Sequence, residues 1–275
     1  TKLVAGDFGL TGNLNIDSLG YNGVADGFDR LDWNNVVDLD SDGAFETLDP
    51  GLLLMGSPDL LVNFESGLHF EVSGGVVGTA VVGIEDGTDA TEPDTELLSA
   101  GPVSIRGSAE FSLLRRTVNV DVNGDGTIDG ADLTGAQLDE VALSTNGVSV
   151  VVDDLADLTV SGELGVARVK AANKSTTRYT GLTLGNVTLS TNSVSESLEL
   201  TAEFKIEDLD YNSAADGFER LDWTTAFDLD ADGTADLINP GAGLPTPIEL
   251  TIDFDAGLAY RLSGSLTGTG TDGVF

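Results

Sequence analysis

Residues 21–33 read Tyr-Asn-Gly-Val-Ala-Asp-Gly-Phe-Asp-Arg-Leu-Asp-Trp, and residues 211–223 read Tyr-Asn-Ser-Ala-Ala-Asp-Gly-Phe-Glu-Arg-Leu-Asp-Trp. The two stretches lie 190 positions apart, and the same offset aligns the residues after them without a gap, for example Pro50-Gly51 with Pro240-Gly241. Self-similarity at a fixed period is the signature of a tandem array. We therefore predict one full repeat unit in residues 1–190 and the first part of a second copy in residues 191–275.

Apolar and polar residues alternate along several runs, which is the pattern of a half-buried β-strand. The runs are residues 7–17, 68–84, 103–122, 148–152, 158–166, 182–189 and 198–207. Glycines such as Gly74 and Gly264 interrupt them and predict bulges, bends or close backbone approach. The sequence thus predicts an all-β fold, an elongated tandem repeat of long, bent antiparallel strands packed as two facing sheets in a sandwich. A β-solenoid is the alternative.

The middle of the unit, about residues 86–190, reads as a diverged half-repeat. It also contains an Asp-rich loop followed by long alternating strands, but its loop is unequally spaced from the other two. We treat it as part of the first unit.

The composition is strongly acidic, with 47 Asp and Glu against 12 Lys and Arg and a formal net charge of −35. Nucleic acid is excluded as an expected partner because phosphate contacts need basic side chains. No apolar run approaches the ~18 residues of a membrane span. The chain has no cysteine, so disulfides and thiolate metal sites are absent. Clustered carboxylates in a folded chain call for neutralising cations.

Three Asp-rich loops place oxygen-bearing residues at positions 1, 3, 5, 9 and 12, with glycine at position 6 and a carbonyl at position 7. Hard oxygen ligands at this spacing, with glycine at the sharp turn, are typical of calcium loops. The first loop offers Asp38, Asp40, Asp42, the carbonyl of Ala44, Glu46 and Asp49. The middle loop offers Asp121, Asn123, Asp125, Thr127, Asp129 and Asp132. The third offers Asp228, Asp230, Asp232, the carbonyl of Thr234, Asp236 and Asn239.

Charge supplies the physical reason for a bound ion. Carboxylates crowded into twelve residues repel one another, and a divalent cation removes that repulsion and fixes the turn. We expect about three Ca²⁺ ions, with weaker binding at the third loop because Asn239 stands where an acidic residue would be bidentate. Pro50 and Pro240 follow position 12 and deny these loops the usual exiting helix. An Asp-rich turn that only satisfies its own backbone is the alternative.

The loop from Asp121 to Asp132 resembles the calcium loop of dockerin modules. The layout as a whole resembles the giant secreted or surface-attached tandem-repeat proteins of bacteria, such as adhesins, stalks and surface coats. This resemblance implies an extracellular or cell-surface location in a bacterium. The paired helices of a dockerin are not evident, so the resemblance does not extend to cohesin binding.

The repeated segment before the outer loops has two interpretations. Asp26, Asp29 and Asp32 could be further ligands, with Trp33 and Trp223 as sugar-stacking platforms. Alternatively, Phe28, Leu31 and Trp33 close off the end of a sheet while Arg30 pairs with a carboxylate. We favour the structural interpretation.

An enzyme is not expected. His69 is the single histidine, and the second copy has Ala259 in its place. The expected function is a structural segment of a calcium-stabilised fibre, stalk or surface layer, whose partners are neighbouring copies of itself. The alternative is an adhesion module that binds surface glycans or proteins.

Overall fold

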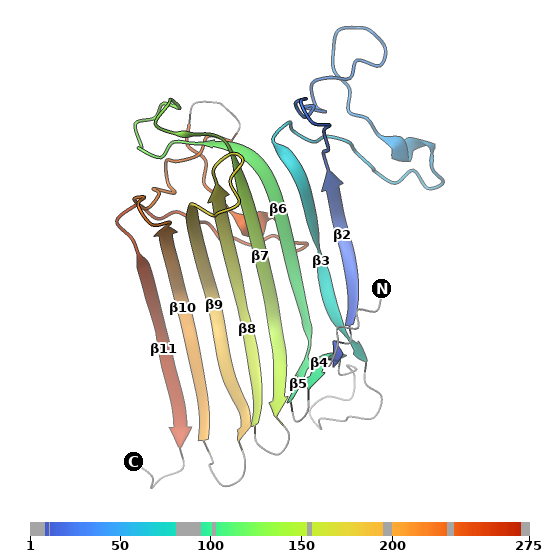
Figure 1. The fold of residues 1–275 in the computed structure, drawn as a ribbon. Coiled ribbons are helices and arrows are strands. Elements are labelled where there is room, and N and C mark those ends of the chain that lie inside the picture. Colours follow the sequence, from blue (N-terminus) through green and yellow to red (C-terminus); the bar gives the residue numbers. More distant parts are fainter. Residues whose placement is uncertain are drawn as a thin grey trace.

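The computed structural model describes residues 9–10, 12–80, 95–100, 103–152, 156–194, 200–229 and 234–270. These residues form one open antiparallel sheet of 11 strands and two short 3₁₀ helices (Figure 1). Among them, no helix has the length and hydropathy needed to cross a membrane. The all-β prediction is confirmed.

Long strands dominate the sheet, as the alternating runs predict. Its strands are β1 (Gly9–Leu10), β2 (Gly12–Tyr21), β3 (Leu68–Ala80), β4 (Thr95–Ala100), β5 (Val103–Arg106), β6 (Ser108–Val120), β7 (Leu133–Val152), β8 (Ala156–Lys170), β9 (Tyr179–Val194), β10 (Leu200–Ala214) and β11 (Tyr260–Gly270). The order is β1-β4-β3-β6-β7-β8-β9-β10-β11, with β2 paired to β3, and β5 paired to β4 and β7. The 3₁₀ helices are η1 (Pro50–Leu53) and η2 (Pro240–Gly243).

The predicted bends occur where glycine faces a bulge. The β2–β3 register shifts between Ile16 and Ser18, and the β10–β11 register shifts between Ile206 and Asp208. A Cβ on Gly74 would collide with the carbonyl oxygen of Asn15, and one on Gly264 with that of Lys205. Glycine is therefore required there for close approach of the two backbones.

A long loop joins β2 to β3, and its counterpart joins β10 to β11. We call residues 22–67 the first long loop and residues 215–259 the second long loop. In the first, the Asn22 amide donates to Leu31 O (2.9 Å) and Glu65 O (3.0 Å) and accepts from Trp33 Nε1 (3.2 Å).

The same hydrogen bonds recur 190 positions later. Asn212 donates to Leu221 O (2.9 Å) and Asp255 O (3.1 Å) and accepts from Trp223 Nε1 (3.1 Å). Both loops also contain an isolated antiparallel bridge, Leu48 with Val62 and Ile238 with Ile252. The sequence repeat is therefore matched by equivalent local structure in the two loops.

The second long loop turns back across the sheet and covers one face of β6 to β9. Its buried residues meet apolar side chains of those strands in the main core cluster. From the loop come Leu221, Trp223, Ala226, Phe227, Ile238, Ile252 and Phe254; from the strands come Val118, Val120, Leu133, Ala136, Leu138, Ala167, Val169 and Tyr179. Trp223 and Leu138 are fully buried there. The main core therefore lies between the second long loop and one face of the sheet.

The predicted sandwich of two facing sheets is wrong for the described residues, because all their strands belong to one sheet. A single covering loop takes the place expected of a second sheet. Every pairing between the described strands is antiparallel, so stacked parallel coils of a solenoid do not describe them either. Alternation requires one buried face but does not say whether a sheet or a loop buries it.

Replacing Asn212 with Ala should cost about 3 kcal/mol of unfolding free energy, because it leaves the indole N–H and two carbonyls of a buried site without a partner. Asn22→Ala removes the same contacts, and Asn22 itself is as buried as Asn212, but its partners Leu31 and Trp33 are more exposed than Leu221 and Trp223. Water can therefore replace the lost bonds, and the variant should lose only about 1 kcal/mol of unfolding free energy. Urea denaturation of the two variants measures the difference, and equal losses would contradict the role assigned to the exposure of the partners.

Candidate metal centre

The first Asp-rich loop gathers four carboxylates at one point in the first long loop. One carboxylate oxygen from each of Asp38, Asp40, Asp42 and Glu46 lies within 4.8 Å of the others. None of the four forms an ion pair with a basic side chain in the described part of the chain. This arrangement can hold a metal ion, since hard cations take carboxylate oxygen as ligand.

Local hydrogen bonds explain why these side chains converge. Asp38 accepts from the Gly43 N–H (3.1 Å), Asp42 accepts from the Ala44 N–H (2.8 Å), and Glu46 accepts from the Leu39 N–H (2.6 Å). Gly43 has a φ of 90°, which favours glycine at the sharp turn. Side chains that bond back to the loop's own amides turn inward.

The middle loop, between β6 and β7, is closed by backbone amides. Asp121 is buried and accepts from the N–H groups of Asn123 (3.2 Å), Gly124 (2.7 Å) and Gly126 (2.7 Å). Asp132 accepts from Val122 (2.9 Å) and Asp129 (2.9 Å), which joins the two ends of the loop.

The remaining middle-loop candidates bond locally as well. Asp125 accepts from the side chain of Asn123 (3.0 Å) and from the Thr127 N–H (2.8 Å), and Asp129 accepts from the Ala131 N–H (2.7 Å). Within the described ranges, only the first loop brings three or more acidic groups within 4.8 Å of one another. The middle loop therefore shares the calcium-loop spacing without the same convergence of charge.

The third loop is described in part. Asp230 and Asp232 lie outside the described residues. Asp236 accepts from the Leu229 N–H at 2.6 Å, which repeats the bond between Glu46 and Leu39 in the first loop. Ligation by Asp228 and by the carbonyls of Ala44, Thr127 and Thr234 stays a prediction.

The structure gives the residues at position 12 of the outer loops another role. Asp49 Oδ1 accepts from the N–H groups of Gly51 (2.9 Å) and Leu60 (3.1 Å), and Asn239 Oδ1 accepts from those of Gly241 (3.1 Å) and Leu250 (3.0 Å). Both residues are N-caps of a 3₁₀ helix. Asp49 lies outside the convergent group. A single acceptor oxygen suffices for this cap, so Asp and Asn can replace one another here.

The tryptophan segments support the structural interpretation in the second copy. Trp223 is fully buried, with its ring centroid 5.6 Å from that of Phe227, so it offers no face to a sugar. Three details of the first copy differ from the prediction. Phe28 is 74% exposed and Leu31 is 48% exposed, so neither closes off the sheet. Among the described residues, Arg30 donates to the carbonyl of Asn22 (3.0 Å) and not to a carboxylate. The guanidinium thus holds the backbone at the loop entrance.

His69 lies at the base of the first long loop. Its Nε2 is 2.6 Å from the Thr117 hydroxyl. Burial, helped by the charges of Arg30 and Arg115, lowers the pKa of His69. The contact joins β3 to β6.

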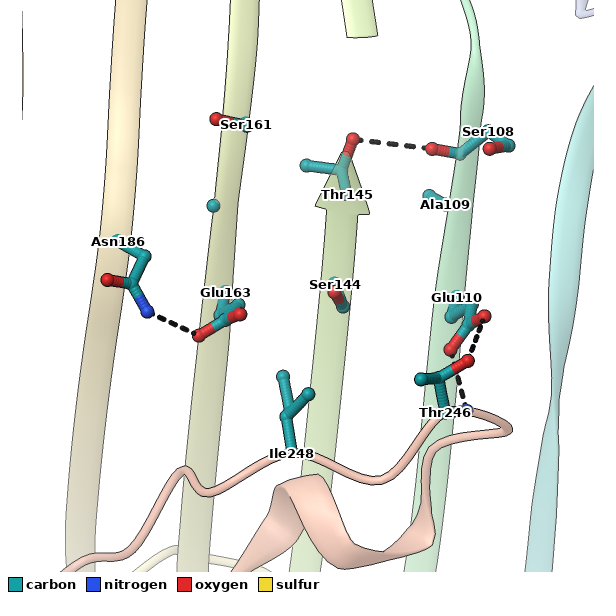
Figure 2. Close-up of a pocket in the computed structure, with 11 residues that line it drawn as sticks. Ser108, Ala109, Glu110, Ser144, Thr145, Ser161, Glu163, Asn186, Thr246 and Ile248 are labelled. Carbon is teal, nitrogen blue, oxygen red and sulfur yellow. Dashed lines mark hydrogen bonds between the residues drawn. The ribbon is translucent and has the colours of Figure 1, made fainter. Parts of the chain in front are cut away.

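A polar cavity of about 440 Å³ lies where Thr246 and Ile248 of the second long loop approach the sheet (Figure 2). Thr246 donates to Glu110 through its N–H and its hydroxyl, both at 2.9 Å, and Asn186 donates to Glu163 at 3.1 Å. Serine and threonine side chains from β6, β7 and β8 complete the wall. Sequence reasoning missed this cavity because its residues come from four strands and a distant loop.

Comparisons of the chain with protein-family models, with curated proteins and with solved structures give no match.

Asp49→Asn should leave both stability and any calcium affinity unchanged, because asparagine keeps the acceptor oxygen that Asp49 uses. Asp49→Ala should lower the unfolding free energy by about 1 kcal/mol through loss of the cap. Thermal melts and calcium titrations of the two variants check this. Loss of calcium affinity in a stable Asp49→Asn variant would instead show that Asp49 is a ligand.

Proposed function

We propose that this chain is a calcium-stabilised structural segment of an extracellular fibre, stalk or surface layer built from repeating units. The observation that carries the proposal is the convergence of Asp38, Asp40, Asp42 and Glu46 within 4.8 Å. Unit negative charges at this separation repel by about 1 kcal/mol per pair even in bulk water. A bound dication turns that repulsion into attraction and adds its binding energy to folding.

Calcium fits the loop better than magnesium. The four converging carboxylates of the loop stand at positions 1, 3, 5 and 9 of a calcium loop, with glycine at position 6. Calcium accepts the irregular, flexible geometry of such loops. Magnesium demands near-ideal octahedral geometry and dehydrates reluctantly. Exposed loops of this kind suit the weak sites of extracellular modules, with dissociation constants of about 10⁻⁴ to 10⁻³ M. This supports an extracellular or cell-surface location.

A structural role also agrees with the shape of the sheet. The strands stand side by side in one open sheet, and the two long loops leave the same end of it (Figure 1). Successive repeats added at the sheet edges would lengthen such a sheet, since each repeat contacts mainly its neighbours. The partners proposed are therefore neighbouring copies of the same repeat.

A chelator-treated full chain should bind calcium saturably in calorimetry, and its melting temperature should rise with calcium concentration by linkage. The double variant Asp40→Asn, Asp42→Asn should lose one site. Asp59→Asn, an exposed carboxylate outside the group, is the matched control and should behave as the unaltered chain. A flat titration, or equal melting temperatures in chelator and in calcium, would refute the calcium part of the proposal.

Adhesion is the second candidate function, and the polar cavity of Figure 2 favours it. Its carboxylates, amide and hydroxyls are groups that bind sugar hydroxyls. Adhesion predicts saturable binding to a glycan panel that Glu163→Gln weakens at least tenfold and the exposed Glu203→Gln leaves unchanged. A structural segment predicts no saturable binding to any glycan, and glycan-array measurement separates the two functions.

A further inference from the structure

The first long loop exposes apolar residues whose counterparts in the second long loop are buried. Leu31 is 48% exposed and Leu54 is 52% exposed, whereas Leu221 is 1% and Leu244 is 3% exposed. We call this surface the first-loop apolar face. It comprises Leu31, Val36, Leu54 and Leu60, which correspond to the buried Leu221, Ala226, Leu244 and Leu250.

The cover over the second copy is visible within the chain. The Asp121 N–H, just after β6, donates to Ala226 O (3.0 Å), and the Ala215 N–H donates to Arg178 O (2.8 Å) before β9. Gly181 of β9 lies under the indole of Trp223, where an added Cβ would come within 2.9 Å of the ring. The occupant of this face in the second copy is thus the four-stranded segment from β6 to β9.

The first long loop has the same backbone frame without that cover. The backbone N–H of Trp33 donates to Phe64 O (2.8 Å), and that of Trp223 donates to Phe254 O (3.1 Å). Likewise, the backbone N–H of Glu46 donates to Val37 O (2.7 Å), and that of Asp236 donates to Phe227 O (2.7 Å). The backbone that carries the contact with β6 to β9 in one copy therefore has equivalent hydrogen bonds in the other, with Val37 in the place of Phe227.

The edge of the sheet next to this loop is also open. β10 pairs with β9 on one side and β11 on the other, whereas its counterpart β2 pairs, among the described strands, with β3 but with no strand in the place of β9. In Figure 1, β2 lies at one edge of the sheet, and the first long loop extends beyond that edge. The missing strand and the missing cover lie on the same side.

We propose that the open edge of β2 and the first-loop apolar face together bind a four-stranded antiparallel segment equivalent to residues 108–190, supplied by the preceding repeat of the same array. A second whole copy of this chain does not fit, because its own β6 to β9 face is already covered by its second long loop. The inference rests on the repeat-array part of the proposed function and is independent of calcium.

The test extends the full chain by one such segment. A copy of residues 103–190 is fused directly before Thr1, so that the junction reproduces the 190-residue period. The fused segment adds no tryptophan, so Trp33 and Trp223 remain the two fluorophores. In the unfused chain, acrylamide should quench the partly exposed Trp33 and spare the buried Trp223. In the fusion, the quenching constant of Trp33 should fall at least threefold and its emission should shift to the blue.

The matched control carries Gly181→Leu in the fused copy alone, where the added side chain occupies the space of the indole ring. It should leave Trp33 as accessible as in the unfused chain. Unchanged quenching of Trp33 in the unmodified fusion overturns the proposal, whether the added segment folds or not, because docking is what would cover its apolar face. Repeating the measurement in chelator separates this outcome from a failure of calcium binding.

Discussion

The contact between the second long loop and the β6–β9 face is the interaction on which the rest of the structure depends. In its described residues the second long loop has no regular strand or α-helix. Its backbone N–H and C=O groups must therefore find other hydrogen-bond partners where its apolar side chains are buried. The Asn212 side chain supplies some of these partners, because it donates to Leu221 O and Asp255 O and accepts from Trp223 Nε1, which links the first part of the loop to its last part. The strands bury the apolar side chains of the loop, which pack against Leu138, Val169 and Gly181. One sheet with one covering loop thus forms a core.

The chain carries an excess of carboxylates, with a formal net charge of −35. Inside the sheet, charges are compensated locally. Glu140 is 5% exposed and bonds to Arg116 (2.6 Å), and burial raises its pKa although the guanidinium partly offsets this. In the first Asp-rich loop, no described basic side chain plays that part, which is why a cation is proposed there.

Much of the architecture could be predicted from residue patterns. Alternation identified most of the long strands, and the 190-residue offset predicted two loops of equivalent structure. Residues 133–147, the larger part of β7, were missed: the predicted run began at residue 148, and Gly135 interrupts the beginning of the strand. The number of sheets was predicted wrongly, since alternation reports a buried face but not its cover. The spacing of the Asp-rich loops could not show that Asp49 and Asn239 cap a 3₁₀ helix, because capping and ligation use the same oxygen atoms.

Amide hydrogen exchange of the full chain tests the central claim most directly, because it compares two copies of one loop within one molecule. If cover by the β6–β9 face stabilises the loop, the amides of Trp223, Asp236 and Ile252 should exchange at least tenfold more slowly than those of Trp33, Glu46 and Val62. All six donate equivalent hydrogen bonds, so local bonding alone predicts no difference. Equal protection of the two sets would contradict the account.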